Sequence, residues 1–108
     1  MNAVKDQVRD LVFVELAAAN EKFPQFHSAH EGWAVIQEEI NEMKFDMKWV
    51  KKYQKLLFFD IMKNSGKITL DGTANLIKEY AEKAACEAIQ VAAMAQKFMD
   101  MDEENEKD

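Results

Sequence analysis

The sequence predicts an all-α protein whose helices pack as a bundle. Apolar residues make up 48% of the 108 residues and charged residues 31%, as in a globular domain rather than a disordered chain. Only three glycines and one proline interrupt the chain, and apolar residues recur every three or four positions, as on one face of a helix. The length suits one domain, so we expect a single helical domain over residues 1–100 and an acidic, frayed tail over residues 101–108.

The first helix is expected to begin after Asn2 and to end near Lys22, just before Pro24. Its apolar residues lie at helical spacing and therefore share one face. They are Val4, Val8, Leu11, Val12, Leu16 and Ala19. This face predicts packing against the other helices.

The second helix is expected to begin at a capping box formed by Ser28 and Glu31. In this motif each side chain satisfies a free backbone N–H of the other residue. The apolar stripe of this helix contains Trp33, Ile36, Ile40, Met43, Met47 and Val50. Helical spacing continues to Ile61, which is long for a compact domain of this size, so we expect a kink or a short loop at residues 44–47.

The final helix follows residues 64–67, whose composition, Asn-Ser-Gly-Lys, is typical of a turn. Residues 68–70 are too few to assign, and Asp71 or Thr73 is expected to cap a helix that runs to about residue 100. Its many alanines allow another helix to approach closely. They are Ala81, Ala84, Ala85, Ala88, Ala92 and Ala95. Alanine-rich and methionine-rich faces of this extent exceed what one thin bundle buries, so we expect a homodimer or a dimer of dimers.

Charge and cysteine content exclude several classes of protein. The net charge of −6 lies mostly in residues 100–108, which hold six acidic residues and one lysine. Residues 44–67 are the one basic stretch, with seven lysines and two aspartates. A nucleic-acid-binding module is an alternative that the overall acidity opposes. Cys86 has no partner for an internal disulfide, no leader is visible, and no apolar run is long enough to span a bilayer, so we expect a cytoplasmic protein without a membrane partner.

Acidic residues fall on the apolar faces of all three helices. Glu87 lies inside the apolar arc of the final helix, with Gln90 at its edge. Glu39 borders the arc of the second helix, and Glu42 shares its side, while Glu15 falls in the middle of the first face. For one such acid alone, pairing with a lysine would be the simplest explanation. Carboxylates brought together from several helices repel one another unless a hard cation neutralises them, so the pattern indicates Mg²⁺ or Mn²⁺.

Two segments of the sequence resemble motifs of a known protein family. Residues 38–42, Glu-Glu-Ile-Asn-Glu, and residues 87–90, Glu-Ala-Ile-Gln, resemble the paired E-x-x-E and E-x-x-D motifs of the MazG-like all-α nucleotide pyrophosphohydrolases. The flanking residues 26–36 and 87–95 are similar to short MazG-related proteins of bacteriophages and prophages. The resemblance covers residues 8 to 102 and is weakest over residues 45–64.

The resemblance implies a helical bundle completed by a dimer or tetramer. It also implies Mg²⁺-dependent hydrolysis of a nucleoside triphosphate to the monophosphate and pyrophosphate. By position, the implied metal ligands are Glu39, Glu42 and Glu87, and Gln90 stands where the family has aspartate. Glu38 or Glu39 would orient or deprotonate the attacking water.

Several other residues are candidates for contacting a nucleotide. His27, His30, Trp33 and Trp49 are able to stack on a base, although tryptophans at such positions more often pack in a core. Lys44 and Lys48, with the lysines that follow them, would line a channel for phosphates, although lysines at this spacing more often form a solvated face.

The alternative to an enzyme is a catalytically silent helical dimer of the same fold that binds a nucleotide or another protein. Gln90 favours this alternative, because a neutral amide replaces an anionic ligand. A di-iron site is excluded, since no glutamate has a histidine three residues later.

Overall fold

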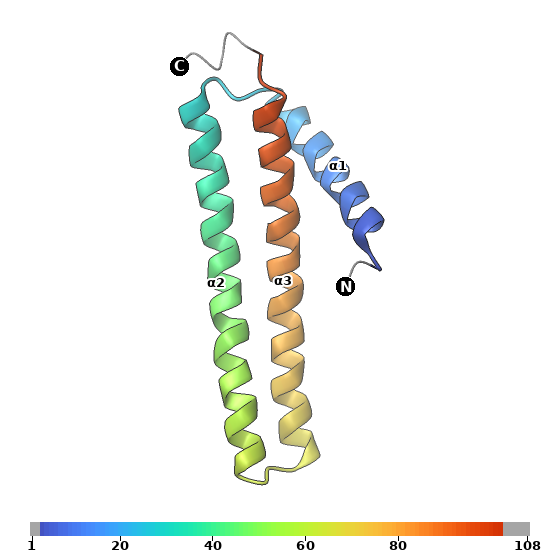
Figure 1. Cartoon of the computed structure of the whole chain (residues 1–108), viewed down its shortest axis with the longest axis vertical. Helices are drawn as coiled ribbons and strands as arrows, with labels where there is room; N and C mark the ends of the chain where they lie inside the picture. Colours follow the sequence, from blue (N-terminus) through green and yellow to red (C-terminus); the bar gives the residue numbers. More distant parts are fainter. Residues whose placement is uncertain (1–2, 103–108) are drawn as a thin grey trace. The chain divides into compact units, whose positions relative to one another are not determined.

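The computed structural model describes residues 3–102, and these form three helices joined by short loops (Figure 1). Helix α1 spans Lys5–Lys22, α2 spans Ala29–Met62 and α3 spans Lys67–Met99. No strand occurs among these residues. The all-α prediction is therefore confirmed. None of these helices combines the length and the apolar character that a membrane span requires.

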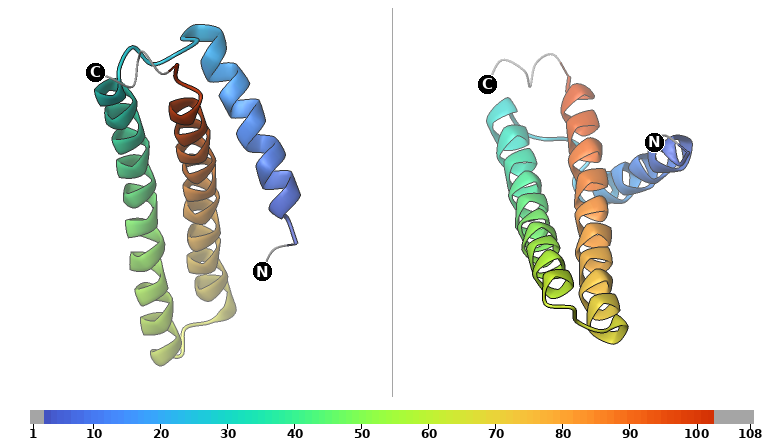
Figure 2. Two further views of the ribbon diagram at one scale, coloured as in Figure 1. Left: turned by 45° about the horizontal axis from the view of Figure 1, so that its top comes forward. Right: turned by 60° about the horizontal axis from the view of Figure 1, so that its bottom comes forward.

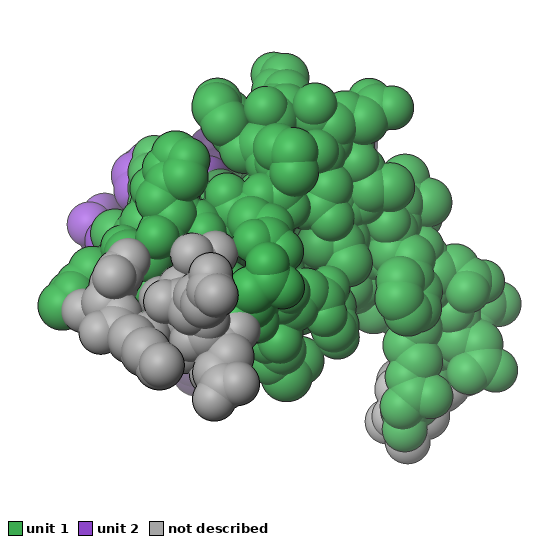
Figure 3. Space-filling model, turned by 90° about the horizontal axis from the view of Figure 1, so that it is seen from above, with its two compact units in different colours: residues 1–40, 87–108 green, residues 41–86 purple. Residues whose placement is uncertain are grey.

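The chain forms two compact units (Figure 3). Unit 1 consists of residues 1–40 and 87–108, and unit 2 consists of residues 41–86. Helices α2 and α3 each contribute one part to unit 1 and the other part to unit 2. The single-domain expectation stays a prediction, and most of the expected acidic tail, residues 103–108, lies outside the described residues.

In unit 1, the C-terminal part of α3 lies between α1 and the N-terminal part of α2 (Figures 1 and 2). Its core draws on each segment: Leu16 from α1, Phe26 from the loop, Ala93 from α3, and Met101 just after α3 are all buried. Met101 belongs to the range that the sequence assigned to the tail, yet only 5% of it is exposed.

The start of α2 follows the predicted capping pattern with one difference. The backbone N–H of Glu31 donates to Ser28 Oγ (3.1 Å), as expected. The Glu31 carboxylate accepts from the backbone N–H of His27 (3.3 Å) and contacts His27 Nδ1 (3.1 Å). The glutamate thus closes the loop one residue earlier than the usual box and fixes the path of the chain into α2.

Gly32 permits close packing of three segments in unit 1. A Cβ atom at this position would lie 2.6 Å from Cδ2 of Phe98 and 2.9 Å from Cδ2 of Phe26. Both distances are shorter than van der Waals contact, and the Phe26 ring is 3% exposed and has little room to move. The absence of a side chain at Gly32 therefore lets the loop and α3 pack directly against the first turn of α2.

Unit 2 is a helical hairpin with an aromatic cluster between its helices. The rings of Trp49, Tyr53 and Tyr80 stack on one another, with centroids 5.8–6.0 Å apart. Near the turn, the hydroxyl of Thr73 donates to the buried carboxylate of Asp60 (3.2 Å). Stacking and this polar contact explain why residues 45–62 continue the helix.

The structure corrects two predicted boundaries. Helix α2 runs unbroken through residues 44–47, so the expected short loop is absent from this described segment. Helix α3 begins at Lys67, so residues 68–70 are helical and neither Asp71 nor Thr73 is a cap. Asp71 instead pairs with Lys67 within the first turn (3.0 Å), and Thr73 is buried against Asp60.

The predicted turn is confirmed for residues 64–66, whereas Lys67 already belongs to α3, and α2 ends in a Schellman motif. Asn64 has φ of 60°, in the left-handed region. The N–H of Ser65 donates to the Asp60 carbonyl (2.9 Å), and that of Asn64 donates to the Ile61 carbonyl (3.0 Å). Asparagine tolerates this conformation better than most residues, which explains how α2 ends without glycine at that position.

We expect Gly32→Ala to lower the free energy of unfolding by about 1–3 kcal/mol, because the added methyl group overpacks the contact with Phe26 and Phe98. Gly72→Ala is the matched control: it is also helical, but nothing lies within 4 Å of its Cβ position. That change should stabilise α3 by about 0.5–1 kcal/mol. Urea denaturation of both variants measures the difference, and equal stabilities would contradict this account of Gly32.

Candidate metal centre

Helix α2 presents the first acidic motif on consecutive turns. Glu39 is half-buried, whereas Glu38 and Glu42 are exposed. Glu42 follows Glu39 by three residues in an unbroken helix, so the two carboxylates lie on one side of α2. Around the helix, Glu38 lies about 100° from Glu39 and about 40° from Glu42.

Glu87, on α3, completes the group. One carboxylate oxygen from each of Glu39, Glu42 and Glu87 lies within 4.8 Å of the other two. The Oε2 atoms of Glu39 and Glu87 are shielded from solvent. Partly buried negative charges at this separation repel strongly, because water screens them poorly.

The three carboxylates fit a divalent cation with an oxygen preference. In octahedral coordination at about 2.1 Å, neighbouring ligand oxygens of Mg²⁺ are about 3.0 Å apart and opposite ones about 4.2 Å. The separations of up to 4.8 Å are longer than both, so the side chains would have to move closer together to bind one ion. Carboxylate oxygens are also the ligands that Mg²⁺ and Mn²⁺ prefer. Glu39, Glu42 and Glu87 would hold the ion, and water or a phosphate would occupy the other positions.

A hollow of about 300 Å³ in unit 1 brings together polar side chains from all three helices. Glu15 enters it from α1, Glu39 from α2 and Gln90 from α3. Its walls include Ala18, Ala19, Ala93 and Met94, and Lys22 also lines it. The hollow therefore gives Glu39 an open side from which a ligand is able to approach.

Lys22 also lines this hollow, and it was not among the residues predicted from the sequence. Glu15 and Lys22 are seven residues apart, close to two helical turns, and therefore share a face of α1. This spacing in the sequence indicates that Lys22 lies on the same side of α1 as Glu15. Only the structure shows that this face meets Glu39 and Gln90.

Gln90 lies one helical turn after Glu87 and lines the hollow, as its place in the motif predicts. Its amide oxygen is able to bind a cation but carries no charge. The site therefore holds three carboxylates where the motif it resembles has four acidic residues.

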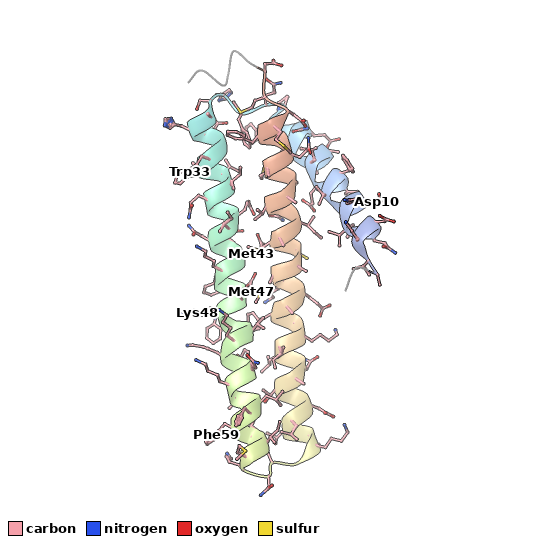
Figure 4. All side chains as sticks on the ribbon, viewed as in Figure 1. Asp10, Trp33, Met43, Met47, Lys48 and Phe59 are labelled. Carbon is pink, nitrogen blue, oxygen red and sulfur yellow. The ribbon has the colours of Figure 1, made fainter. Side chains whose placement is uncertain are left out.

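The other candidate residues of unit 1 are spread over its surface. Trp33 is 64% exposed and projects from the side of α2 that faces away from α3 (Figure 4), so the prediction that it belongs to the apolar stripe is wrong. His30 is exposed. His27 is also exposed but lies beside Glu31 and lines a second hollow.

The candidates in unit 2 lie on α2. Trp49 stacks on Tyr53 and Tyr80, and Lys52 lies over its ring, so its faces are used in packing. Lys44 and Lys48 line a shallow hollow of about 430 Å³ with other lysines of the same helix and Met47. In unit 2, Trp49 is thus a packing residue, as the simpler sequence interpretation has it.

Comparison with known proteins gives no relative for the chain. No family model, no curated protein and no solved structure matches it.

If the three carboxylates hold a metal, Mn²⁺ or Mg²⁺ should stabilise the folded chain. At about 100 times its Kd, a bound ion adds about 2.7 kcal/mol to the free energy of unfolding. We expect this gain in the wild type and little of it in Glu87→Gln. Without metal, Glu87→Gln should be at least as stable as the wild type, because one repelling charge is removed.

Glu21→Gln is the matched control, since Glu21 is an exposed glutamate of α1 outside the group. Differential scanning fluorimetry with and without the ion gives the comparison. Equal shifts in all three proteins would place the ions elsewhere and make Glu87 a structural residue.

Proposed function

We propose that the chain is a metal-dependent nucleoside triphosphate pyrophosphohydrolase of the MazG-like type. The observation that supports this is the convergence of Glu39 and Glu42 from α2 with Glu87 from α3. Such a group binds Mg²⁺ or Mn²⁺ and leaves coordination positions for phosphate oxygens, as enzymes of phosphoryl transfer require. The resemblance of residues 38–42 and 87–90 to paired acidic motifs supports the same activity.

The proposed reaction divides its chemistry between the ion and the carboxylates. The ion would neutralise the phosphates, and Glu38 or Glu39 would orient a water molecule and accept its proton. The water oxygen bonds to one of the two phosphorus atoms beside the α–β bridging oxygen, and the bond from that phosphorus to the bridge breaks. The products are a nucleoside monophosphate and pyrophosphate. Glu39 is better placed for this role than Glu38, because it lines the hollow in unit 1.

We expect slow release of pyrophosphate, without single phosphate, below a typical turnover of about 10 per second. Glu39→Gln or Glu42→Gln should abolish it, because each removes a carboxylate of the group. Gln90→Asp should raise it by restoring a fourth anionic ligand. A pyrophosphate assay across the eight common triphosphates tests these outcomes, with Glu21→Gln as the unaffected control.

A silent nucleotide-binding module is the second candidate, because Gln90 gives the hollow a neutral amide. If triphosphates raise the melting temperature but neither the wild type nor Gln90→Asp cleaves them, this function replaces the enzyme.

We also propose that the chain self-associates. No large side chain among residues 3–102 is fully buried, whereas sixteen large hydrophobic side chains are exposed. Val4, Val8 and Leu11 were predicted to pack within the bundle, but they are 60%, 40% and 48% exposed. Their helical spacing makes them one apolar stripe on α1, and a second copy of the chain would cover it.

Light scattering after size exclusion should give a dimer or tetramer at micromolar concentration. Replacing both Val8 and Leu11 by lysine should shift the mass downward, since both side chains lie on the exposed stripe. Asp10→Lys is the control, because Asp10 lies about 130° around α1 from the middle of this stripe. Figure 4 shows Asp10 on the side of α1 that faces away from α3. A wild-type mass near the monomer value of 12.5 kDa would contradict the proposal.

A further inference from the structure

A second hollow, of about 440 Å³, lies in unit 1 beside the loop between α1 and α2. Its walls are mainly apolar and include Phe23, Phe26, Val35 and Met94. Phe23 directly follows the end of α1 and is 68% exposed, whereas Phe26 is 3% exposed. The hollow thus has one fixed aromatic wall and one accessible aromatic ring.

A buried cation contacts both of these residues. Lys97 is 5% exposed, and its Nζ donates to the backbone carbonyl of Phe23. The same Nζ lies 4.9 Å from the centroid of the Phe26 ring. One side chain of α3 therefore holds the backbone at Phe23 and the ring of Phe26, so this part of the hollow is formed before any ligand binds, while the Phe23 ring stays accessible.

The rim of the hollow has one hydrogen-bond acceptor with a fixed position. The Glu31 carboxylate is held by the backbone N–H of His27 and by His27 Nδ1. A carboxylate accepts about four hydrogen bonds, so it retains sites for a ligand. Such an acceptor favours ligands that carry N–H groups.

This hollow adjoins the hollow that contains Glu39. Ala19, Lys22 and Met94 line both. A ligand that spans them would have a planar apolar part near Phe23 and an anionic part near Lys22 and the carboxylate group. A nucleotide has both parts, because it carries a planar base and anionic phosphates.

We infer that the hollow at Phe23 and Phe26 binds the base of the nucleotide whose phosphates are held beside Glu39. This inference rests on the proposed function and adds the position and class of the base. The ring of Phe23 stacks on the base, because every base offers an aromatic face. Glu31 accepts from an exocyclic amino group, which selects adenine and cytosine over thymine, because thymine has an acceptor oxygen where cytosine has its amino group.

Two experiments test separately where the base binds and where the phosphates bind. In the first experiment, isotope-labelled full-length chain is titrated with dAMP, dCMP or dTMP in the presence of EDTA and followed by NMR. We expect dAMP and dCMP to bind several-fold more tightly than dTMP. Phe23→Ala should weaken dAMP binding about five-fold or more, and Glu31→Gln, which retains an acceptor oxygen for the loop, should reduce the preference over dTMP.

Phe13→Ala is the matched control, because Phe13 is an equally exposed phenylalanine of α1, at 64%, outside the hollow. It should bind dAMP as the wild type does. A loss of affinity in Phe13→Ala as large as in Phe23→Ala, or no loss in either, would overturn the inference.

The second experiment measures inorganic triphosphate with Mg²⁺ by calorimetry. Binding that depends on Glu87 but not on Phe23 is expected. If triphosphate binds and no monophosphate does, the base hollow is wrong and the metal centre stands. If monophosphates bind through Phe23 and triphosphate does not bind, the proposed function fails and the base hollow stands. Contacts between copies that involve Phe23 would show that a second chain fills the hollow, and would overturn the inference.

Discussion

The main constraint on unit 1 is the partial burial of Glu39 and Glu87, because a carboxylate away from water needs a cation or hydrogen-bond donors nearby. The surrounding side chains determine which groups can serve this purpose. Helix α1 packs through Leu16 and brings Glu15 and Lys22 to the same hollow, so cationic and anionic side chains meet there. Gly32 allows Phe26 and Phe98 to pack against the first turn of α2 and thereby holds the loop beside the hollow. Residues that line the hollow and residues of the apolar core therefore come from the same segments of unit 1.

The sequence predicts the helices well where the helical spacing of apolar residues agrees with the residues that cap or end a helix. The end of α1, the start of α2 at Ser28 and the turn at Asn64 all follow from local signals. The loop expected at residues 44–47 does not form, because stacking of Trp49 and Tyr53 on Tyr80 supports a continuous helix, and such stacking depends on residues distant in sequence. The start of α3 was placed too late, since Asp71 and Thr73 serve contacts other than capping.

The candidate site could be predicted in part from the helical periodicity. Helical periodicity indicated that Glu39, Glu42 and Glu87 share inner faces, and their carboxylates do lie together. It did not indicate which apolar faces remain uncovered, because burial depends on the neighbouring helix and not on spacing alone. Trp33 and the stripe of Val8 and Leu11 show this limit. For the same reason, the hollow beside Phe23 had no sequence signal: Lys97 lies 74 residues away from the carbonyl that it binds.

The division of the chain into units has a consequence for the order of folding. Unit 2 consists of one continuous segment, residues 41–86, and its contacts join helices that a short turn connects. Contacts of this local kind form quickly. Unit 1 pairs residues up to position 40 with residues from position 87 onward, so the entropy lost on closing its loop is larger. During synthesis the hairpin of unit 2 is able to form while the ribosome still holds the end of α3. The acidic residues of α2 therefore remain hydrated until the second segment of unit 1 emerges, and the ability to bind a ligand appears last.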